Sequence, residues 1–90
     1  TDNSLIVPEI LEKIAKAESG GKQFDSQGNV IIGISGDIGK FQIAPQYWSK
    51  KARELGYDLY QENGNTMMAL WIYNHFGTTP WNWSRSKWDY

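Results

Sequence analysis

The sequence has no cysteine, so it can form neither a disulfide nor a thiolate metal site, and its stability must come from packing. It also has no surplus of either charge, because nine Lys and Arg residues stand against ten Asp and Glu residues, for a net charge of -1 at pH 7. A chain with this balance has no excess positive charge with which to bind a phosphate backbone, which argues against nucleic acid as a partner. No apolar run approaches the roughly 20 residues that cross a bilayer, so we expect no membrane span.

Aromatic residues are what the sequence has in excess. Aromatic residues make up 14% of the sequence, and most of them are the five Trp and five Tyr residues. Hydrophobic residues as a whole make up 40%. A length of 90 residues suffices for one hydrophobic core, so residues 1–90 are expected to form a single domain. Because a core of this size does not need so many rings, some should lie on a binding surface. The start at Thr1 predicts a processed chain or an excised domain.

Apolar periodicity predicts several helices. The stretch from Pro8 to Glu18 begins with proline and carries an apolar stripe, so it should form an amphipathic helix. Ala44-Pro45 should open a second helix that continues to Leu55. A short final helix should begin at Thr79-Pro80, which is suited to be an N-cap and N1 pair.

The stretch from Asn65 to Phe76 is apolar nearly all the way round, which is typical of a helix enclosed by others. It should be the central helix and place Leu70 and Trp71 in the core. Between the first two helices, β-branched residues flank a turn within Phe24 to Ile34, which predicts a short β-hairpin or an irregular β-lobe. The expected fold class is therefore α+β and mostly helical, with a small β-lobe.

Glu18 is the most informative position for chemistry. It follows Ile14 by one helical turn and so extends the apolar stripe of its helix. A carboxyl in such a place should be partly desolvated, which raises its pKa and lets it act as a general acid near neutral pH. The alternative is a carboxylate at a helix end that simply reaches water.

Two short motifs and a set of downstream residues carry a family resemblance. The motifs are Ala17-Glu18-Ser19-Gly20-Gly21 and Gly36-Asp37-Ile38-Gly39-Lys40-Phe41-Gln42-Ile43. The downstream residues, with their spacing, are Ala69, Gly77, Trp81 and Ser84. In this order they resemble the lysozyme-like superfamily, in particular lytic transglycosylases, goose-type lysozymes and resuscitation-promoting-factor domains. The resemblance implies a lysozyme-like fold over nearly the whole chain.

The same resemblance implies roles for individual residues. Glu18 would be the general acid and base at the glycosidic oxygen, and Ser19 would support the substrate or the catalytic loop. Gly39 would let backbone approach the sugar, and Gln42 would hydrogen-bond the ligand from the floor of the cleft. From the residues alone, Gly39 and Gln42 could equally be a turn glycine and a buried amide that satisfies loop backbone.

Hydrolysis of a glycoside usually requires a second carboxylate. Asp37 is the candidate, because it stands beside the Gly-x-x-Gln segment, whereas Asp25 is more simply an Asx-turn residue. Without such a carboxylate the substrate itself can supply the nucleophile. This happens in the lytic transglycosylases, where the C6 hydroxyl of the muramyl residue attacks the anomeric carbon of the same sugar. The weakness of the second candidate favours the transglycosylase reaction, and hydrolysis with Asp37 stays open.

Several aromatic side chains are candidates for sugar stacking. Tyr47 and Trp83 are expected at the same groove as Glu18, with Trp88 as an alternative, while Trp81 should close the core. Tyr73 lies on the central helix and could be either a substrate-binding or a core residue.

The resemblance implies an enzyme that cleaves the β-1,4 bond between N-acetylmuramic acid and N-acetylglucosamine in peptidoglycan. Such an enzyme would need no cofactor, and no metal site is expected, because the Asp25-to-Asn29 turn has too few acidic ligands for calcium. It would act as a monomer on glycan strands outside the cytoplasmic membrane, in the periplasm or extracellular space. A wall-binding module with little turnover is the alternative from another class.

Overall fold

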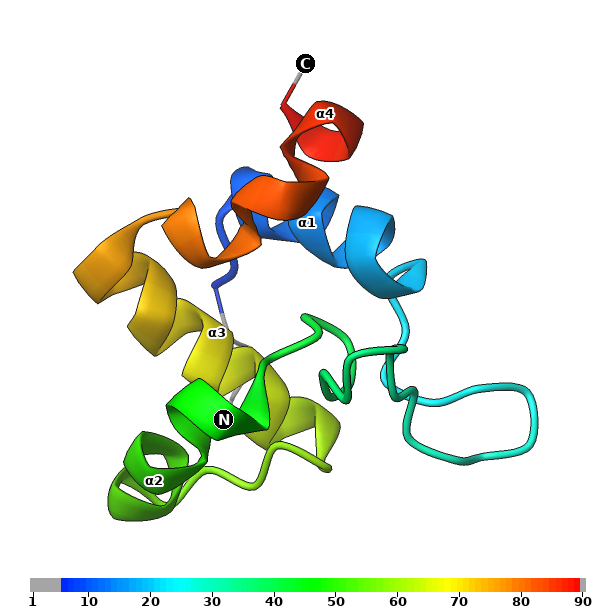
Figure 1. The fold of residues 1–90 in the computed structure, drawn as a ribbon, viewed down its shortest axis with the longest axis vertical. Coiled ribbons are helices and arrows are strands. Elements are labelled where there is room, and N and C mark those ends of the chain that lie inside the picture. The colour runs from blue at the N-terminus through cyan, green and yellow to red at the C-terminus, as the bar shows by residue number, and fades with distance from the viewer. Residues whose placement is uncertain (1–5, 90) are drawn as a thin grey trace.

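The computed structural model describes residues 6–89, and these form a helical domain without a sheet. Its elements, in chain order, are α1 (Glu9–Ser19), α2 (Pro45–Leu55), α3 (Glu62–Phe76), a 3-10 helix η1 (Thr79–Ser84) and α4 (Arg85–Trp88). Figure 1 shows a long irregular segment between α1 and α2, with a loop that extends outward at the right of the view. The mostly helical character predicted from the sequence is confirmed.

The first two helices lie within a residue of their predicted positions. The buried stripe of α1 consists of Leu11, Ile14 and Ala15. Gly20 ends this helix in the left-handed conformation, with φ of 73°, and its N–H donates to the carbonyl of Lys16. This stop places Glu18 in the last turn of α1.

The central helix α3 begins three residues before the predicted start and ends at the predicted Phe76. Its most deeply buried apolar side chains are Met68, Ala69 and Ile72. The prediction that Leu70 and Trp71 lie in the core was wrong, because both are only partly buried against its edge. Successive residues of a helix are rotated by about 100°, so when positions 65, 68, 69 and 72 face the core, positions 70 and 71 lie to the side of that stripe.

The predicted β-hairpin is not confirmed, since no strand is present among the described residues, and the segment has the irregular form that was the alternative. Three isolated antiparallel bridges stand in its place, Phe24 with Val30, Ile32 with Ile38, and Ile38 with Ile43. Glycines in the left-handed region interrupt this segment, and pairing therefore stops after single residues. They are Gly28, Gly36 and Gly39.

The turn predicted at Asp25 is confirmed. The Asp25 carboxylate accepts hydrogen bonds from the backbone N–H of Gln27, at 2.9 Å, and of Asn29, at 3.0 Å. These bonds make it an Asx turn. Within residues 6–89 no group of His, Cys, Asp or Glu side chains could hold a metal ion.

A buried side chain on α3 braces the irregular segment. The amide nitrogen of Asn65 donates to the carbonyls of Ile38 and Leu59, each at 2.9 Å. Its amide oxygen accepts from the N–H of Phe41 at 3.0 Å. Asn65 thus supplies the backbone partners that a sheet would have supplied, and holds residues 38–41 against the core.

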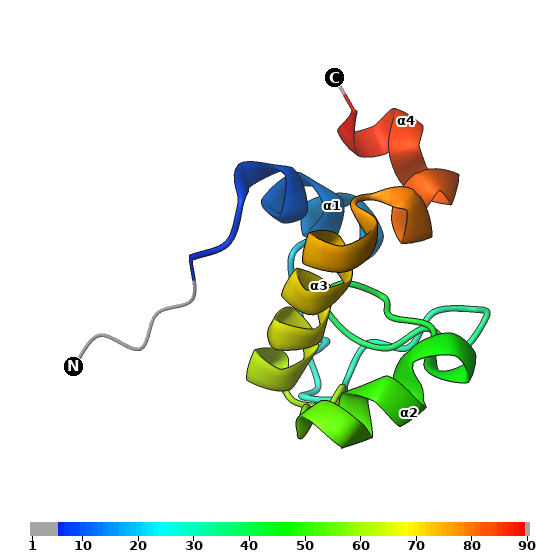
Figure 2. The ribbon, with the colours of Figure 1, turned by 90° about the vertical axis from the view of Figure 1, so that its left-hand side faces the viewer.

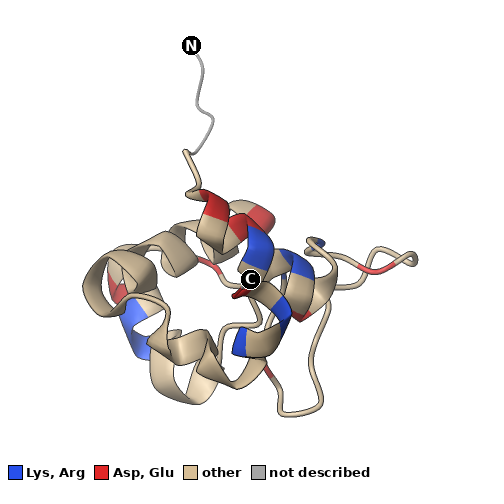
Figure 3. Ribbon diagram, turned by 90° about the horizontal axis from the view of Figure 1, so that it is seen from above, with Lys and Arg blue, Asp and Glu red and all other residues tan. Residues whose placement is uncertain are grey.

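The helices fall into two groups with α3 between them. Figure 2 shows α1, η1 and α4 at one end, α2 at the other, and α3 running from one to the other. In Figure 3, acidic positions mark the start of α1, and basic positions lie toward its end and on the adjoining α4. None of the helices in the described part of the chain is long and apolar enough to cross a membrane.

Candidate active-site groove

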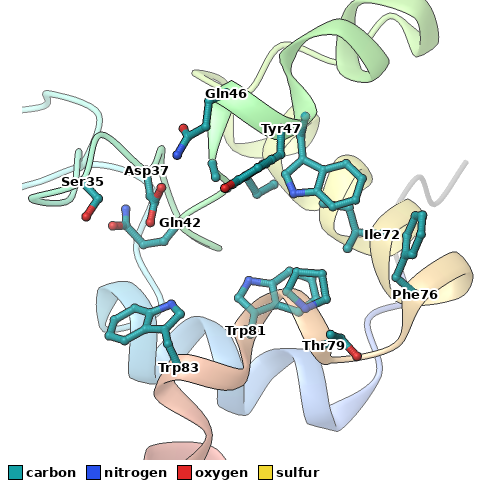
Figure 4. A pocket seen from close by; sticks show the side chains of 14 residues that line it. Ser35, Asp37, Gln42, Gln46, Tyr47, Ile72, Phe76, Thr79, Trp81 and Trp83 are labelled. Carbon is teal, nitrogen blue, oxygen red and sulfur yellow. The ribbon is translucent and has the colours of Figure 1, made fainter.

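A groove of about 710 Å³ is bounded by the irregular segment, α2, the second half of α3 and η1. One end is polar, with the side chains of Ser35, Asp37, Gln42 and Gln46. The remainder is mostly apolar and aromatic, and is lined by Tyr47, Trp48, Ile72, Phe76, Pro80, Trp81 and Trp83 among others. In Figure 4, Trp83 stands on η1 and faces Gln42 and Asp37 across the polar end.

Gln42 lines this groove and is held by the loop that carries it. Its backbone has φ of 49°, the only positive value at a residue other than glycine among the described residues. Its side-chain amide donates to the carbonyls of Gly39, at 2.9 Å, and of Ile31, at 3.3 Å. Gln42 therefore satisfies loop backbone, as one of its two predicted roles requires, and its side chain also lines the groove.

Gly39 is buried away from the groove. A Cβ at this position would lie 2.5 Å from the amide nitrogen of Asn65 and 2.6 Å from the amide oxygen of Gln23. Gln23 is itself buried, and its oxygen accepts from the N–H of Lys40 at 2.8 Å. In this structure the absent side chain of Gly39 makes room for two buried amides, and no groove-lining contact of Gly39 is present.

Ser19 joins the end of α1 to the same loop. Its hydroxyl donates to the carbonyl of Lys40 at 2.7 Å, and it also lies 3.1 Å from the carbonyl of Ala15. Its oxygen accepts from the N–H of Lys22. Of the two roles implied for Ser19, this geometry fits support of the loop.

Glu18 is partly buried, and one of its carboxyl oxygens has been left without a hydrogen bond. Oε2 contacts the hydroxyl of Ser84, whereas Oε1 is buried and has no hydrogen-bond partner among residues 6–89. Burial raises the pKa of Glu18, the Ser84 hydrogen bond lowers this pKa, the charge of Asp37 raises it and that of Lys87 lowers it. The net shift is upward, as the sequence predicted.

Glu18 does not itself line the groove. Its carboxyl lies at η1, the helix whose Trp81 and Trp83 form one wall, and Asp37 on the opposite side is close enough to act on its pKa. The structure thus brings Glu18, Asp37, Gln42 and Trp83 to one region.

Ser84 is the residue of this region whose role sequence reasoning missed. It is 1% exposed, and its hydroxyl contacts Glu18, the carbonyl of Trp81 at 3.1 Å and the indole nitrogen of Trp88 at 3.0 Å. Its place in the downstream residue pattern was the available signal. The contact itself joins positions 66 residues apart, which no local periodicity reveals.

The aromatic candidates divide between the groove and the core. Tyr47 and Trp83 line the groove and are 76% and 68% exposed. Trp88 is only 2% exposed, so of the two Trp alternatives Trp83 is the surface residue. Trp81 closes the core as predicted, and its indole N–H donates to the carbonyl of Phe41 at 2.9 Å. Tyr73 packs against the core and does not contribute to the groove lining.

Comparison of the chain with protein-family models, with curated proteins and with solved structures returned no match.

Proposed function

We propose that this protein is a peptidoglycan-cleaving glycosidase of lysozyme-like fold, which acts outside the cytoplasmic membrane as a lytic transglycosylase with Glu18 as its acid and base. The observation that carries the proposal is the state of Glu18. Burial raises its pKa, and Oε1 makes no hydrogen bond to the described protein. A carboxyl built only for stability would have both oxygens satisfied.

The composition of the groove supports a carbohydrate substrate. Exposed rings at Tyr47 and Trp83 offer flat apolar faces to the C–H surfaces of sugar rings. The polar end offers amide and carboxylate groups from Gln42, Gln46 and Asp37 to hydroxyl and acetamido groups. A glycan strand that spans both ends would bring a glycosidic bond beside η1.

The proposed reaction needs no water. Glu18 donates its proton to the glycosidic oxygen as the bond from that oxygen to the anomeric carbon breaks. The muramyl C6 hydroxyl then attacks the anomeric carbon, and the Glu18 carboxylate removes the hydroxyl proton. The products are a 1,6-anhydromuramyl end and a free 4-hydroxyl on the leaving sugar, and the enzyme returns to its protonated form.

Access to Glu18 places a condition on this reaction. Because Oε1 is buried and Glu18 does not line the groove, a bound glycan can reach this oxygen only after a local rearrangement beside η1. Productive binding should therefore be accompanied by a change around Trp81 or Trp83, which Trp fluorescence can follow.

The position of Asp37 favours a second candidate, a hydrolytic lysozyme. Asp37 lines the groove, and its charge acts on Glu18. Those are the properties of a carboxylate that could hold an attacking water or serve as the nucleophile. The two reactions differ in their products, since hydrolysis leaves a reducing end that is heavier than the anhydro end by one water.

Mass analysis of digested peptidoglycan tests the proposal. Anhydro ends from the wild type, retained within about tenfold by Asp37→Asn, are expected for a transglycosylase. Reducing ends that disappear in Asp37→Asn would establish the hydrolase instead. Binding to peptidoglycan without any soluble product would reject both enzymes in favour of a wall-binding module.

A further inference from the structure

The Ser84 hydroxyl stands at the centre of three contacts from three different residues. It has one hydrogen to donate and two lone pairs that can accept. The indole N–H of Trp88 is a donor only, so at 3.0 Å it occupies one lone pair of Ser84. The single hydroxyl hydrogen is then left for one of two acceptors, Glu18 Oε2 or the carbonyl of Trp81.

The carboxyl is the stronger of these acceptors once it carries charge. A hydrogen bond to an ionised group is roughly twice as strong as one between neutral groups. The Trp81 carbonyl, at 3.1 Å from the hydroxyl oxygen, is neutral. Ionisation of Glu18 should therefore draw the Ser84 hydrogen fully to Oε2, while Trp88 keeps the hydroxyl oxygen in place.

We propose that Ser84 is the positioning residue for Glu18, whose hydroxyl holds Oε2 and so leaves Oε1 as the oxygen that exchanges the proton with the glycosidic bond. This inference rests on the proposed function and adds that the two carboxyl oxygens have different roles, one in positioning and one in proton transfer. Oε2 is tied to η1, and Oε1 has no partner among the described residues. A proton carried on Oε1 is therefore not engaged by the protein and is free for transfer once the substrate reaches this buried oxygen.

The arrangement helps the chemical step because its strength changes during that step. As Glu18 gives up its proton, negative charge develops on the carboxyl, and the bond from Ser84 to Oε2 becomes stronger. An interaction that strengthens toward the transition state raises kcat, whereas one of constant strength affects binding alone. Loss of Ser84 should thus lower kcat more than it changes KM.

Loss of Ser84 should also change the titration of Glu18 in a direction that simple destabilisation does not. The bond from Ser84 lowers the pKa of Glu18 against burial and against Asp37, while Lys87 on α4 also lowers it. Ser84→Ala removes only the hydroxyl, so the pKa of Glu18 should rise further. Unfolding would have the opposite effect, because it would return the pKa toward its ordinary value of 4.5.

NMR titration of the Glu18 carboxyl carbon tests the inference without reference to activity. In the wild type, the indole N–H resonance of Trp88 should follow the same titration, because Ser84 joins the two groups, and that of Trp48 on α2 should not. In Ser84→Ala, the pKa of Glu18 should rise. In the matched control Ser86→Ala, which alters an exposed serine on the adjoining helix α4, it should stay at the wild-type value. An unchanged pKa of Glu18 in folded Ser84→Ala would overturn the inference. So would a Trp88 indole resonance in the wild type that does not shift as Glu18 titrates.

Kinetics on peptidoglycan complete the test. Ser84→Ala should lower kcat on the order of tenfold or more with little change in KM, and should move the alkaline limb of the pH profile upward. Equal kcat values for Ser84→Ala and the wild type would reject the positioning role. A wild type without activity whose titrations behave as expected would reject the proposed function and leave the coupling of Ser84 to Glu18 established.

Discussion

A carboxyl whose pKa is raised by burial destabilises the folded protein when it is ionised. Glu18 is in this position, because its folded-state pKa lies above the ordinary value of 4.5. Its contribution favours folding below pH 4.5 and is lost as pH rises through the raised pKa. A residue that costs stability at neutral pH is typical of a functional site.

Replacement of Glu18 by Gln separates this cost from catalysis. Gln keeps the shape of the protonated acid but has no transferable proton. Activity on peptidoglycan should fall by several orders of magnitude while binding is retained. The melting temperature should rise at pH 7 and change little at pH 4, as scanning calorimetry can show. Glu12→Gln, on the exposed face of the same helix, should change neither property appreciably.

The crowding at Gly39 predicts a second residue-scale effect. Gly39 and Gly28 both have positive φ, but only at Gly39 would a Cβ meet other side chains. Both alanine substitutions should incur backbone strain of about 1 to 2 kcal/mol. Gly39→Ala should cost a further 1 to 3 kcal/mol or so, from displaced Asn65 and Gln23. Equal free energies of unfolding for the two variants, measured with urea, would show that the side chains of Asn65 and Gln23 move aside at no cost.

At the scale of elements, the extent of each main helix could be predicted from the sequence, whereas the irregular segment could not. Periodicity and the residues that end helices are local, and they located α1, α2 and α3 within about three residues. The form of residues 22–44 depends on distant groups. Asn65 on α3 supplies hydrogen bonds there, and within the segment Gln23 accepts one from Lys40, 17 positions away; no local pattern identifies these partners.

The stripe of α3 predicts which of its side chains stabilise the fold. Ile72 is 1% exposed, while Leu70 is only partly buried. Ile72→Ala should therefore cost about 2 to 5 kcal/mol, and Leu70→Ala clearly less. Chemical denaturation of the two variants gives the comparison. A larger loss at Leu70 would mean that α3 is rotated from the position described.

The helix η1 presents its two tryptophans differently, and this difference predicts separate effects. Trp83 is exposed on the groove, so Trp83→Ala should weaken binding of chitooligosaccharides or muropeptides and leave the melting temperature nearly unchanged. Trp81→Ala should instead unfold or strongly destabilise the protein, by about 3 to 5 kcal/mol. Fluorescence titration and thermal melts measure the two effects. Full binding by Trp83→Ala would exclude this ring from the sugar site.

At the scale of the whole molecule, the candidate site is assembled from parts that lie far apart in the chain. Glu18 comes from α1, Asp37 and Gln42 from the irregular segment, and Trp83 and Ser84 from η1. The types of the site residues were predictable from motifs. Their spatial relation was not, and this explains why Glu18 could be recognised as a candidate while its displacement from the groove lining and its contact with Ser84 could not.

The contact between Glu18 and Ser84 also has a consequence for how the protein acquires its chemistry over time. The two residues are 66 positions apart, so the loop that joins them closes late when a chain emerges from the ribosome from its N-terminus. Until η1 and α4 have docked on α1, Glu18 is an ordinary solvated carboxylate, ionised at neutral pH. A chain that still lacks η1 and α4 would therefore have a Glu18 without its raised pKa and, under the proposed function, without its general acid.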